Sequence, residues 1–267
     1  MISAINGGWD MKYDTIILAG GESTCELRKI APYDNEALII IGNSPMIYYV
    51  YNALKASPHV NRIIVSGPVE ALRNIFAREE NLYFVGSGAN AIESFNNAVH
   101  KLTEMGDITE KLLVLPTDIP FITPEAINDF IAHCEESDAD FYYPVTRREV
   151  NEQKFPGVNR TYVNLKEGTF TGGNLFLIRT AIVGKCLDIG LKLVARRKDP
   201  VAMAKLFGFR LVWKYLIKRL SIAEIKKRFF QVTGIKGEPI ISPFAEVGVD
   251  VDKPSDLELA QQYFSNF

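Results

Sequence analysis

Cysteine, histidine and long apolar runs are all scarce in this sequence. Among its 267 residues are three cysteines, Cys25, Cys134 and Cys186, which lie far apart and include no CxxC pair. That spacing, with no signal-peptide pattern at the N-terminus, excludes a disulfide framework and favours a reducing, cytoplasmic setting. The three histidines are scattered, none near a second metal ligand, so we interpret them as structural. No stretch reaches the ~18 uncharged apolar residues that a bilayer span requires.

The composition is otherwise that of an ordinary globular protein, with 47% hydrophobic and 23% charged residues. The length allows one or two domains. The formal net charge of −2 is distributed unevenly, because residues 185–236 contain 14 Lys and Arg residues against only Asp188, Asp199 and Glu224. This segment therefore carries +11 and the rest of the chain −13.

Apolar runs of strand length alternate with segments of helical period, which is typical of a mainly parallel sheet covered by helices on both faces. We expect a flexible lead-in at residues 1–13, one α/β domain at 14–267 and a basic helical insertion at about 181–236. A capping box at Ser221–Glu224 predicts that one helix ends near Leu220 and another begins there. The expected strands are 15–18, 62–66, 82–85, 112–115, 140–145, 174–178 and 246–249, and the expected helices are 44–56, 69–79, 91–105, one beginning at Thr123, and 254–264.

Ligands of open α/β sheets bind beyond the carboxyl ends of the strands. Gly20 and Gly21 follow the first expected strand, and two glycines there let backbone N–H groups cradle phosphate oxygens, although a tight turn is the simpler interpretation. Asp118 ends the central strand, where a carboxylate needs a partner unless it serves as a turn residue. Asp250 and Asp252 precede the last helix. Carboxylates converging from two loops suit Mg²⁺, which is usually held by one or two of them plus substrate phosphates.

The order of these motifs resembles that of the MobA-like nucleotidyltransferases. The shared segments are Leu18 to Gly21, Leu115 to Pro120, Thr171 to Asn174 and Val251 to Leu257. The resemblance covers residues 14 to about 180 and 245 to 264. It implies a GT-A-like, Rossmann-type fold with a mainly parallel mixed sheet, and transfer of an NMP group from an NTP to a phosphorylated or hydroxylated acceptor with release of pyrophosphate.

The resemblance also implies roles for individual residues. Asp118 and Asp252 would hold Mg²⁺ or Mn²⁺, with Asp118 also a catalytic residue. Gly172, Gly173 and Asn174 would approach the acceptor, and Lys154 or Arg160 would meet its phosphate, unless these two are solvated surface charges. The nucleotide-binding residues would be Leu18, Ala19, Gly20, Gly21, Glu22 and Thr117, with Ser87, Gly88 and Asn90 near the base.

Two positions depart from the family pattern. The family usually carries an Arg where this chain has Cys25 and a Lys where it has Glu36. Such cations neutralise charge on a transferring phosphoryl group, and a Glu would repel it. Arg28 and Lys29 are the candidates to replace them as catalytic residues; otherwise the enzyme is slow or inactive.

The basic segment has no place in the motif set. Arg210, Lys214 and Lys218 recur every four residues and predict one basic face of an apolar helix. We expect this helix to pack on the sheet or in a homodimer, or to lie on an anionic membrane as a peripheral contact. Nucleic acid is not an expected partner, because no nucleic-acid-binding module accompanies the charge.

The leading hypothesis is thus an Mg²⁺-dependent nucleotidyltransferase acting on an NTP and a small acceptor. One alternative is a non-catalytic nucleotide or lipid-phosphate binding protein that kept the fold. The other is a GT-A glycosyltransferase that uses an NDP-sugar, in which Asp118 would serve the diphosphate metal. The Leu-Ala-Gly-Gly opening argues against the glycosyltransferase, since enzymes of that kind seldom need a triphosphate loop there.

Overall fold

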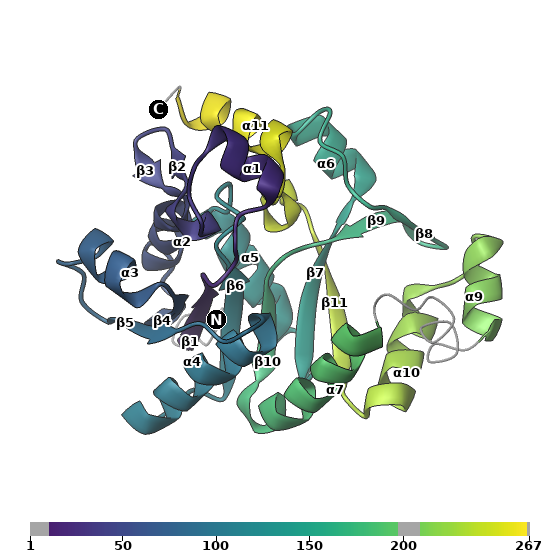
Figure 1. Ribbon diagram of the computed structural model, residues 1–267. Helices are drawn as coiled ribbons and strands as arrows, with labels where there is room; N and C mark the ends of the chain where they lie inside the picture. Colours follow the sequence, from purple (N-terminus) through teal and green to yellow (C-terminus); the bar gives the residue numbers. More distant parts are fainter. Residues whose placement is uncertain (1–10, 197–208, 266–267) are drawn as a thin grey trace, which may run out of the picture.

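The computed structural model describes residues 11–196 and 209–265, arranged around a nine-stranded mixed sheet (Figure 1). Most of the expected lead-in and the middle of the expected insertion therefore lie outside the described residues. The order of the main strands is β5-β4-β1-β6-β10-β7-β9-β8, and β11 pairs with β7. The strands are β1 (Tyr13–Leu18), β4 (Val60–Gly67), β5 (Leu82–Gly86), β6 (Lys111–Pro116), β7 (Phe141–Arg147), β8 (Val163–Leu165), β9 (Gly168–Gly172), β10 (Phe176–Arg179) and β11 (Gly237–Ser242), with a separate pair of β2 (Ile40–Ile41) and β3 (Ser44–Pro45).

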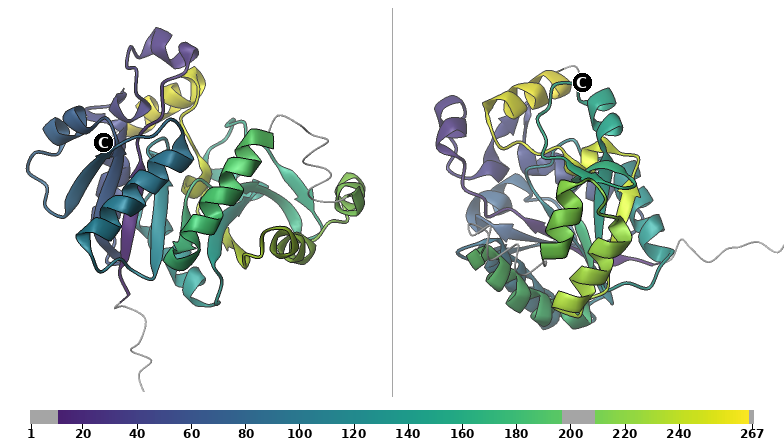
Figure 2. Two further views of the ribbon diagram at one scale, coloured as in Figure 1. Left: turned by 60° about the horizontal axis from the view of Figure 1, so that its bottom comes forward. Right: turned by 90° about the vertical axis from the view of Figure 1, so that its right-hand side faces the viewer.

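Helices follow most of these strands and lie on both sides of the sheet (Figure 2). None of the described helices is long and apolar enough to cross a bilayer. The α-helices are α1 (Cys25–Ile30), α2 (Met46–Lys55), α3 (Val69–Ile75), α4 (Ala91–Met105), α5 (Pro124–Glu135), α6 (Arg148–Lys154), α7 (Val183–Arg196), α9 (Phe209–Leu216), α10 (Ile222–Thr233) and α11 (Pro254–Phe264).

The parallel part of the sheet is formed by β5, β4, β1 and β6. Ile17 of β1 lies opposite Val65 of β4 on one side and Leu115 of β6 on the other. Beyond β6 the sheet becomes mixed, because β10 runs antiparallel to both β6 and β7. The expected α/β Rossmann-like fold is therefore confirmed, and the antiparallel strands are its departure from a fully parallel sheet.

Alternate residues of the central strands belong to two different hydrophobic cores, one on each face of the sheet. Ile17 and Leu113 join the cluster that contains α2 and α5, whereas Ile16 and Val114 join the one that contains α4 and the start of α7. Because successive side chains of a strand point to opposite faces, this alternation shows that both faces are covered. Continuous apolar runs such as residues 112–115 are what strands buried on both faces require.

A third core lies between α1, α6 and α11 at one end of the sheet. Val249 and Val251, both buried, belong to it. Because buried Val249 and Val251 alternate with Asp250 and Asp252, we infer that packing fixes the backbone of this loop and leaves the two carboxylates outside the core. Asp250 is half-buried and Asp252 is exposed.

Several helix starts follow their expected caps. The Thr123 hydroxyl accepts a hydrogen bond from the Ala126 N–H at 3.2 Å, with Pro124 in the first turn. The capping box at Ser221 and Glu224 is present and begins α10. The helix expected at 44–56 begins two residues later, because Ser44 and Pro45 form β3 and α2 begins after them without a side-chain cap.

Two elements near the C-terminal half differ from expectation. Residues 246–249 do not form a strand, because Ala245–Gly248 is a short 3₁₀ helix and the strand that pairs with β7 is β11. The helix containing Lys214 and Lys218 was expected to extend to Leu220 but ends at Leu216, where Lys218 takes a left-handed conformation with φ of 55°. Apolar content alone did not distinguish strand from 3₁₀ helix at residues 246–249.

A buried ion pair fixes the start of β1 against β4. Asp14 is fully buried, and its carboxylate accepts hydrogen bonds from Arg62 at 2.9 and 2.6 Å and from the Thr109 N–H at 3.1 Å. Burial acts to raise the pKa of Asp14, but these hydrogen bonds outweigh it and hold the pKa below its usual range. Folding is therefore favoured above the ordinary pKa of Asp, and this contribution is lost as the pH falls through the lowered value.

We expect Arg62→Met to lower the free energy of unfolding by about 3–5 kcal/mol near pH 7, because it leaves a buried carboxylate without its partner. In the variant the hydrogen bonds from Asn61 and Thr109 remain but the cation is gone, so burial should raise the pKa of Asp14 above its wild-type value. The loss of unfolding free energy should therefore shrink as the pH falls from 7 towards 4. Denaturant titrations over this range measure the effect. Lys55→Met, which breaks the more exposed pair with Glu79, is the control and should cost less than about 1 kcal/mol. An equal deficit at both pH values would contradict the prediction.

Candidate active site

A glycine loop follows β1 and is held by backbone contacts. The N–H of Ala19 bonds to Ser66 of β4 at 2.7 Å, and the N–H of Glu36 bonds to the Gly21 carbonyl at 3.1 Å. A Cβ at Gly20 would lie 2.6 Å from the Cβ of Ser87, and one at Gly21 would lie 2.6 Å from a carboxylate oxygen of Glu36. The close approach of Ser87 therefore requires glycine at position 20, whereas the Glu36 side chain could move away from a Cβ at position 21.

Four carboxylates gather near this loop, and we call Glu36, Asp118, Asp250 and Asp252 the acid cluster. A backbone hydrogen bond of 2.8 Å from the Val251 N–H to the Asp118 carbonyl brings the loop before α11 to the end of β6. The hydroxyl of Thr24, at the start of α1, lies 3.5 Å from the Asp252 carbonyl. Segments from four parts of the chain thus meet at the carboxyl ends of β1 and β6.

The acid cluster is electrostatically crowded. Burial and the neighbouring acids, Asp250 first among them, raise the pKa of Asp118 to about 8. Burial likewise raises the pKa of Glu36 to about 7, with further contributions from Asp252 and Asp250. The pKa of Asp252 is raised by burial and by Asp250. These shifts share a cause, because negative charges in a partly desolvated site disfavour one another.

The cluster is chemically suited to a hard divalent cation. One oxygen of Asp118, Oδ1, is buried and has no hydrogen-bond partner. Within the described residues, no three His, Cys, Asp or Glu side chains are already arranged as a metal cage. Mg²⁺ is commonly held by one or two carboxylates together with substrate phosphates. Asp118 with Asp252 fits that pattern, so the residues present are compatible with Mg²⁺ or Mn²⁺.

The two candidate replacement cations, Arg28 and Lys29, lie on α1. Arg28 approaches Glu22 of the glycine loop at 3.8 Å and Asp34 at 3.7 Å. Lys29 is exposed and forms no ion pair within the described part of the chain. Arg28 is therefore the residue that the structure brings to the loop. Cys25 is exposed at the beginning of the same helix.

The expected base-contacting residues follow β5. Ser87 lies against Gly20, and the Gly88 N–H donates to the Ser94 hydroxyl at 3.0 Å. The side chain of Asn90 caps α4, accepting hydrogen bonds from the N–H groups of Ile92 and Glu93 at 3.0 Å. Asn90 thus serves as the N-cap of α4. Ser87 lies next to the glycine loop.

The expected acceptor residues lie on the other side of the acid cluster. The N–H of Asn174 bonds to the Val247 carbonyl at 2.7 Å, and its side-chain Nδ2 is buried without a partner. Gly173 packs against Pro144, and a Cβ at Gly172 would collide with the hydroxyl of Tyr143. Glycine is therefore needed at both positions for close packing. The unpaired Asn174 amide is a free donor for a ligand.

Both basic residues of this region already pair with acids. Lys154, at the end of α6, forms an ion pair with the buried carboxylate of Glu246. Arg160 pairs with Asp250 and also donates to the Gly172 carbonyl at 3.2 Å. An acceptor phosphate would have to compete with these carboxylates. Arg160 meanwhile links the acceptor side of the site to the acid cluster.

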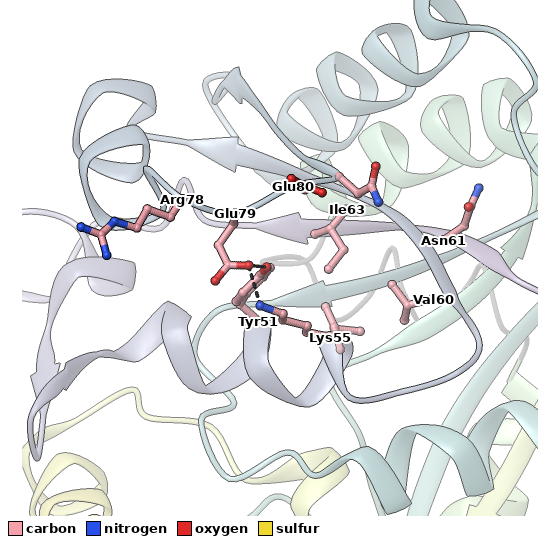
Figure 3. A pocket seen from close by; sticks show the side chains of 10 residues that line it. Tyr51, Lys55, Val60, Asn61, Ile63, Arg78, Glu79 and Glu80 are labelled. Carbon is pink, nitrogen blue, oxygen red and sulfur yellow. Dashed lines mark hydrogen bonds and ion pairs between the residues drawn. The ribbon is translucent and has the colours of Figure 1, made fainter.

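A separate hollow of about 440 Å³ opens at the opposite edge of the sheet (Figure 3). It lies between the end of α2 and the beginning of β4. Glu79 within it accepts hydrogen bonds from Tyr51 at 2.5 Å and from Lys55 at 2.6 Å. The hollow contains none of the motif residues, so it is not the candidate active site.

Two acidic residues of the site were not identified from the sequence as site residues. Glu36 was noted only as a departure from the family pattern, and Glu246 was placed in an expected strand. A signal existed for Glu246, because a charged residue inside an otherwise apolar run indicates a specific partner. Glu36 follows Asp34 and Asn35 and carries no such signal. Glu246 is 1% exposed and one of its oxygens, Oε2, has no hydrogen-bond partner.

Comparisons with known proteins agree with this geometry. Residues 15–211 match the MobA-like NTP transferase domain. A solved hypothetical transferase from Thermus thermophilus is 32% identical, with a TM-score of 0.79 over 92% of this chain and 100% of that one. No curated protein gives a match.

More distant solved structures share the fold. A CMP:2-keto-3-deoxy-manno-octonic acid synthetase complexed with CTP is 13% identical, with a TM-score of 0.60 over 96% of this chain and 99% of that one. A 2-C-methyl-D-erythritol 4-phosphate cytidylyltransferase, also from Thermus thermophilus, is 13% identical, with a TM-score of 0.54 over 96% and 100%. The resemblance noted in the motifs is confirmed by the domain match over residues 15–211. The chain belongs to the MobA-like NTP transferase family.

Proposed function

We propose that the protein transfers an NMP group from an NTP to an oxygen of a small hydroxylated or phosphorylated acceptor and releases pyrophosphate. The observation that carries the proposal is the acid cluster beside the glycine loop at the carboxyl ends of β1 and β6. A loop with two glycines beside Asp118, whose buried Oδ1 has no partner among the described residues, suits a triphosphate with its divalent cation. Family membership supports nucleotidyl transfer in general, and the acceptor is inferred from the chemistry of the site.

Asp118 and Asp252 would hold Mg²⁺ or Mn²⁺. When bound, the ion would offset the negative charge of the triphosphate and of the departing pyrophosphate. The crowding of the acid cluster supports this role. Asp250 pairs with Arg160, but Glu36, Asp118 and Asp252 form no ion pair within the described residues, and a bound cation would offset their charge. The buried, unpartnered Oδ1 of Asp118 points to the same requirement.

The remaining groups bind and orient the NTP and its acceptor. Backbone N–H groups of the Gly20–Gly21 loop would hold phosphate oxygens, and Arg28 would add positive charge beside the loop. The acceptor oxygen attacks the α-phosphorus, and the bond from this phosphorus to the oxygen bridging it to the β-phosphate breaks. Pyrophosphate then leaves with that bridging oxygen. Such a transfer requires positioning and charge stabilisation rather than a nucleophile from the protein.

Asn174 would orient the acceptor through its free Nδ2 group. To contact an acceptor phosphate, Lys154 would have to leave Glu246 and Arg160 would have to leave Asp250. A hydroxyl acceptor without a phosphate would not require either ion pair to break. Both classes of acceptor therefore belong in the experiment. The relative rates with alcohols and with their phosphate esters show which class the paired cations permit.

The test is pyrophosphate release from each of the four common NTPs, with Mg²⁺, in the presence of alcohols, sugars and their phosphates. We expect release that depends on both one NTP and one acceptor class and that stops on addition of EDTA. Calorimetric binding of NTP without any turnover across this panel would favour the non-catalytic binding protein instead. Turnover of an NDP-sugar, with no pyrophosphate from NTP, would favour the glycosyltransferase.

A further inference from the structure

Helix α9 exposes a cluster of large apolar side chains. Trp213 is 64% exposed, Leu216 is 66% exposed, and Ile217, directly after the helix, is 43% exposed. The spacing of three and four residues places them on one side of this helical turn, which continues through a 3.1 Å bond from the Ile217 N–H to the Trp213 carbonyl. Contiguous exposed apolar side chains of this size mark an interaction surface.

Unpaired cations adjoin this cluster. Lys218 and Arg219 follow Ile217, are exposed, and form no ion pair within the described residues. Lys214, by contrast, is paired with Glu224 of α10. We call Trp213, Leu216, Ile217, Lys218 and Arg219 the α9 surface. It combines an apolar centre with free positive charge at its edge.

The α9 surface is anchored to the body of the protein. The Ile222 N–H, at the start of α10, donates to the Glu167 carboxylate at 3.2 Å, and the Lys166 N–H bonds to the Leu220 carbonyl at 2.9 Å. Both bonds tie the segment to the β8–β9 turn. Helix α9 lies at the opposite end of the molecule from α3, as both views show (Figures 1 and 2).

We propose that the α9 surface docks the protein on a membrane that contains anionic lipid. Tryptophan and leucine on one side of a helix with lysine and arginine beside them are suited to the boundary between headgroups and acyl chains. Residues 185–236 carry +11 in an otherwise acidic chain, and within this segment Lys218 and Arg219 lie beside the exposed apolar side chains, where a negative surface would attract them. A second copy is a poorer occupant, because two segments of +11 would repel each other. This proposal stands independently of the transferase activity.

Vesicles provide the test, and the full chain is used throughout. Vesicles of phosphatidylcholine that contain roughly 30–40% of the anionic lipid phosphatidylglycerol are compared with vesicles of pure phosphatidylcholine. We expect co-sedimentation with the anionic vesicles at low salt that weakens at high salt. The chain has two tryptophans, Trp9 and Trp213. In a Trp9→Phe variant, the emission of Trp213 should shift to shorter wavelength with anionic vesicles only.

Variants separate the two contributions of the α9 surface. Lys218→Glu with Arg219→Glu should lower the partition coefficient by about tenfold or more, because each cation contributes near a charged surface. The matched control, Lys12→Glu with Arg73→Glu, makes the same change of net charge at exposed residues elsewhere and should retain most of the binding. Trp213→Ala with Leu216→Ala should also reduce binding. Circular dichroism verifies that each variant is folded.

Three outcomes would overturn the proposal. One is the absence of both co-sedimentation and an emission shift at low salt. Another is an equal loss of vesicle binding in Lys12→Glu with Arg73→Glu and in Lys218→Glu with Arg219→Glu. That result would show that binding depends on the net charge of the protein and not on the α9 surface. The third is a concentration-dependent dimer in solution that Trp213→Ala with Leu216→Ala abolishes, which would assign the α9 surface to a second copy.

Discussion

Asp118→Asn should reduce pyrophosphate release by about 10²–10³-fold while raising the melting temperature measured without divalent cations. The two effects share one cause. The carboxylate is held in a crowded acid cluster with a buried, unpartnered oxygen, so it costs stability unless a cation is present. The folded protein must hold this carboxyl group either protonated or ionised against its neighbours, and Asn removes that cost together with a ligand for the cation. Thermal melting and steady-state turnover of the same preparation measure both effects.

A second readout concerns the cation itself. Mg²⁺ with NTP should raise the melting temperature of the wild type and have little effect on Asp118→Asn, because ligands stabilise the state that binds them. Asp138→Asn is the matched control, since this acid is 79% exposed and pairs with Arg179 away from the site. Turnover within threefold of wild type in Asp118→Asn would remove Asp118 from the mechanism.

Arg28→Ala should lower turnover by about 10²-fold, because it removes the cation that approaches the glycine loop. The structure places Arg28 near Glu22 and Asp34, within reach of a phosphate held at the loop. Partial recovery in Arg28→Lys would show that positive charge at this place is what matters. The measurement is kcat and KM for the NTP, since a charge used mainly in the transition state changes kcat.

Lys29→Ala is the matched control for Arg28→Ala. Lys29 is adjacent in sequence and also on α1 but forms no ion pair within the described residues, and we expect its loss to change turnover less than threefold. Equal effects of the two substitutions would indicate that only the general charge of α1 matters. No effect of either would leave the family's missing Arg and Lys without a replacement.

The strand pattern predicts where Gly20 and Asp118 lie, because the carboxyl ends of the parallel strands β1 and β6 lie at one edge of the sheet. Asp252 comes from the loop before α11, which the strand pattern does not place. Strands such as residues 112–115 pack against a hydrophobic core on each face of the sheet. They must therefore be apolar at every position, and this continuous apolar run is the pattern that predicts them. The α/β fold and the family were accessible for the same reason.

Other features depend on tertiary packing that the sequence pattern does not show. The membership of Glu36 in the acid cluster depends on the loop after α1, whose backbone bonds to Gly21. The pairing of Lys154 with Glu246 joins residues that are 92 positions apart. The 3₁₀ helix at Ala245–Gly248 was taken for a strand, because short apolar runs are ambiguous between strand and helix.

The most direct test of the central claim follows the fate of each phosphate. The protein is incubated with Mg²⁺, an acceptor and NTP labelled at either the α- or the γ-phosphate. Transfer of an NMP group predicts that the α-label enters the acceptor product and the γ-label leaves as pyrophosphate. Appearance of the γ-label in the acceptor, or no acceptor-dependent movement of the α-label with any NTP and acceptor that bind, would contradict the account.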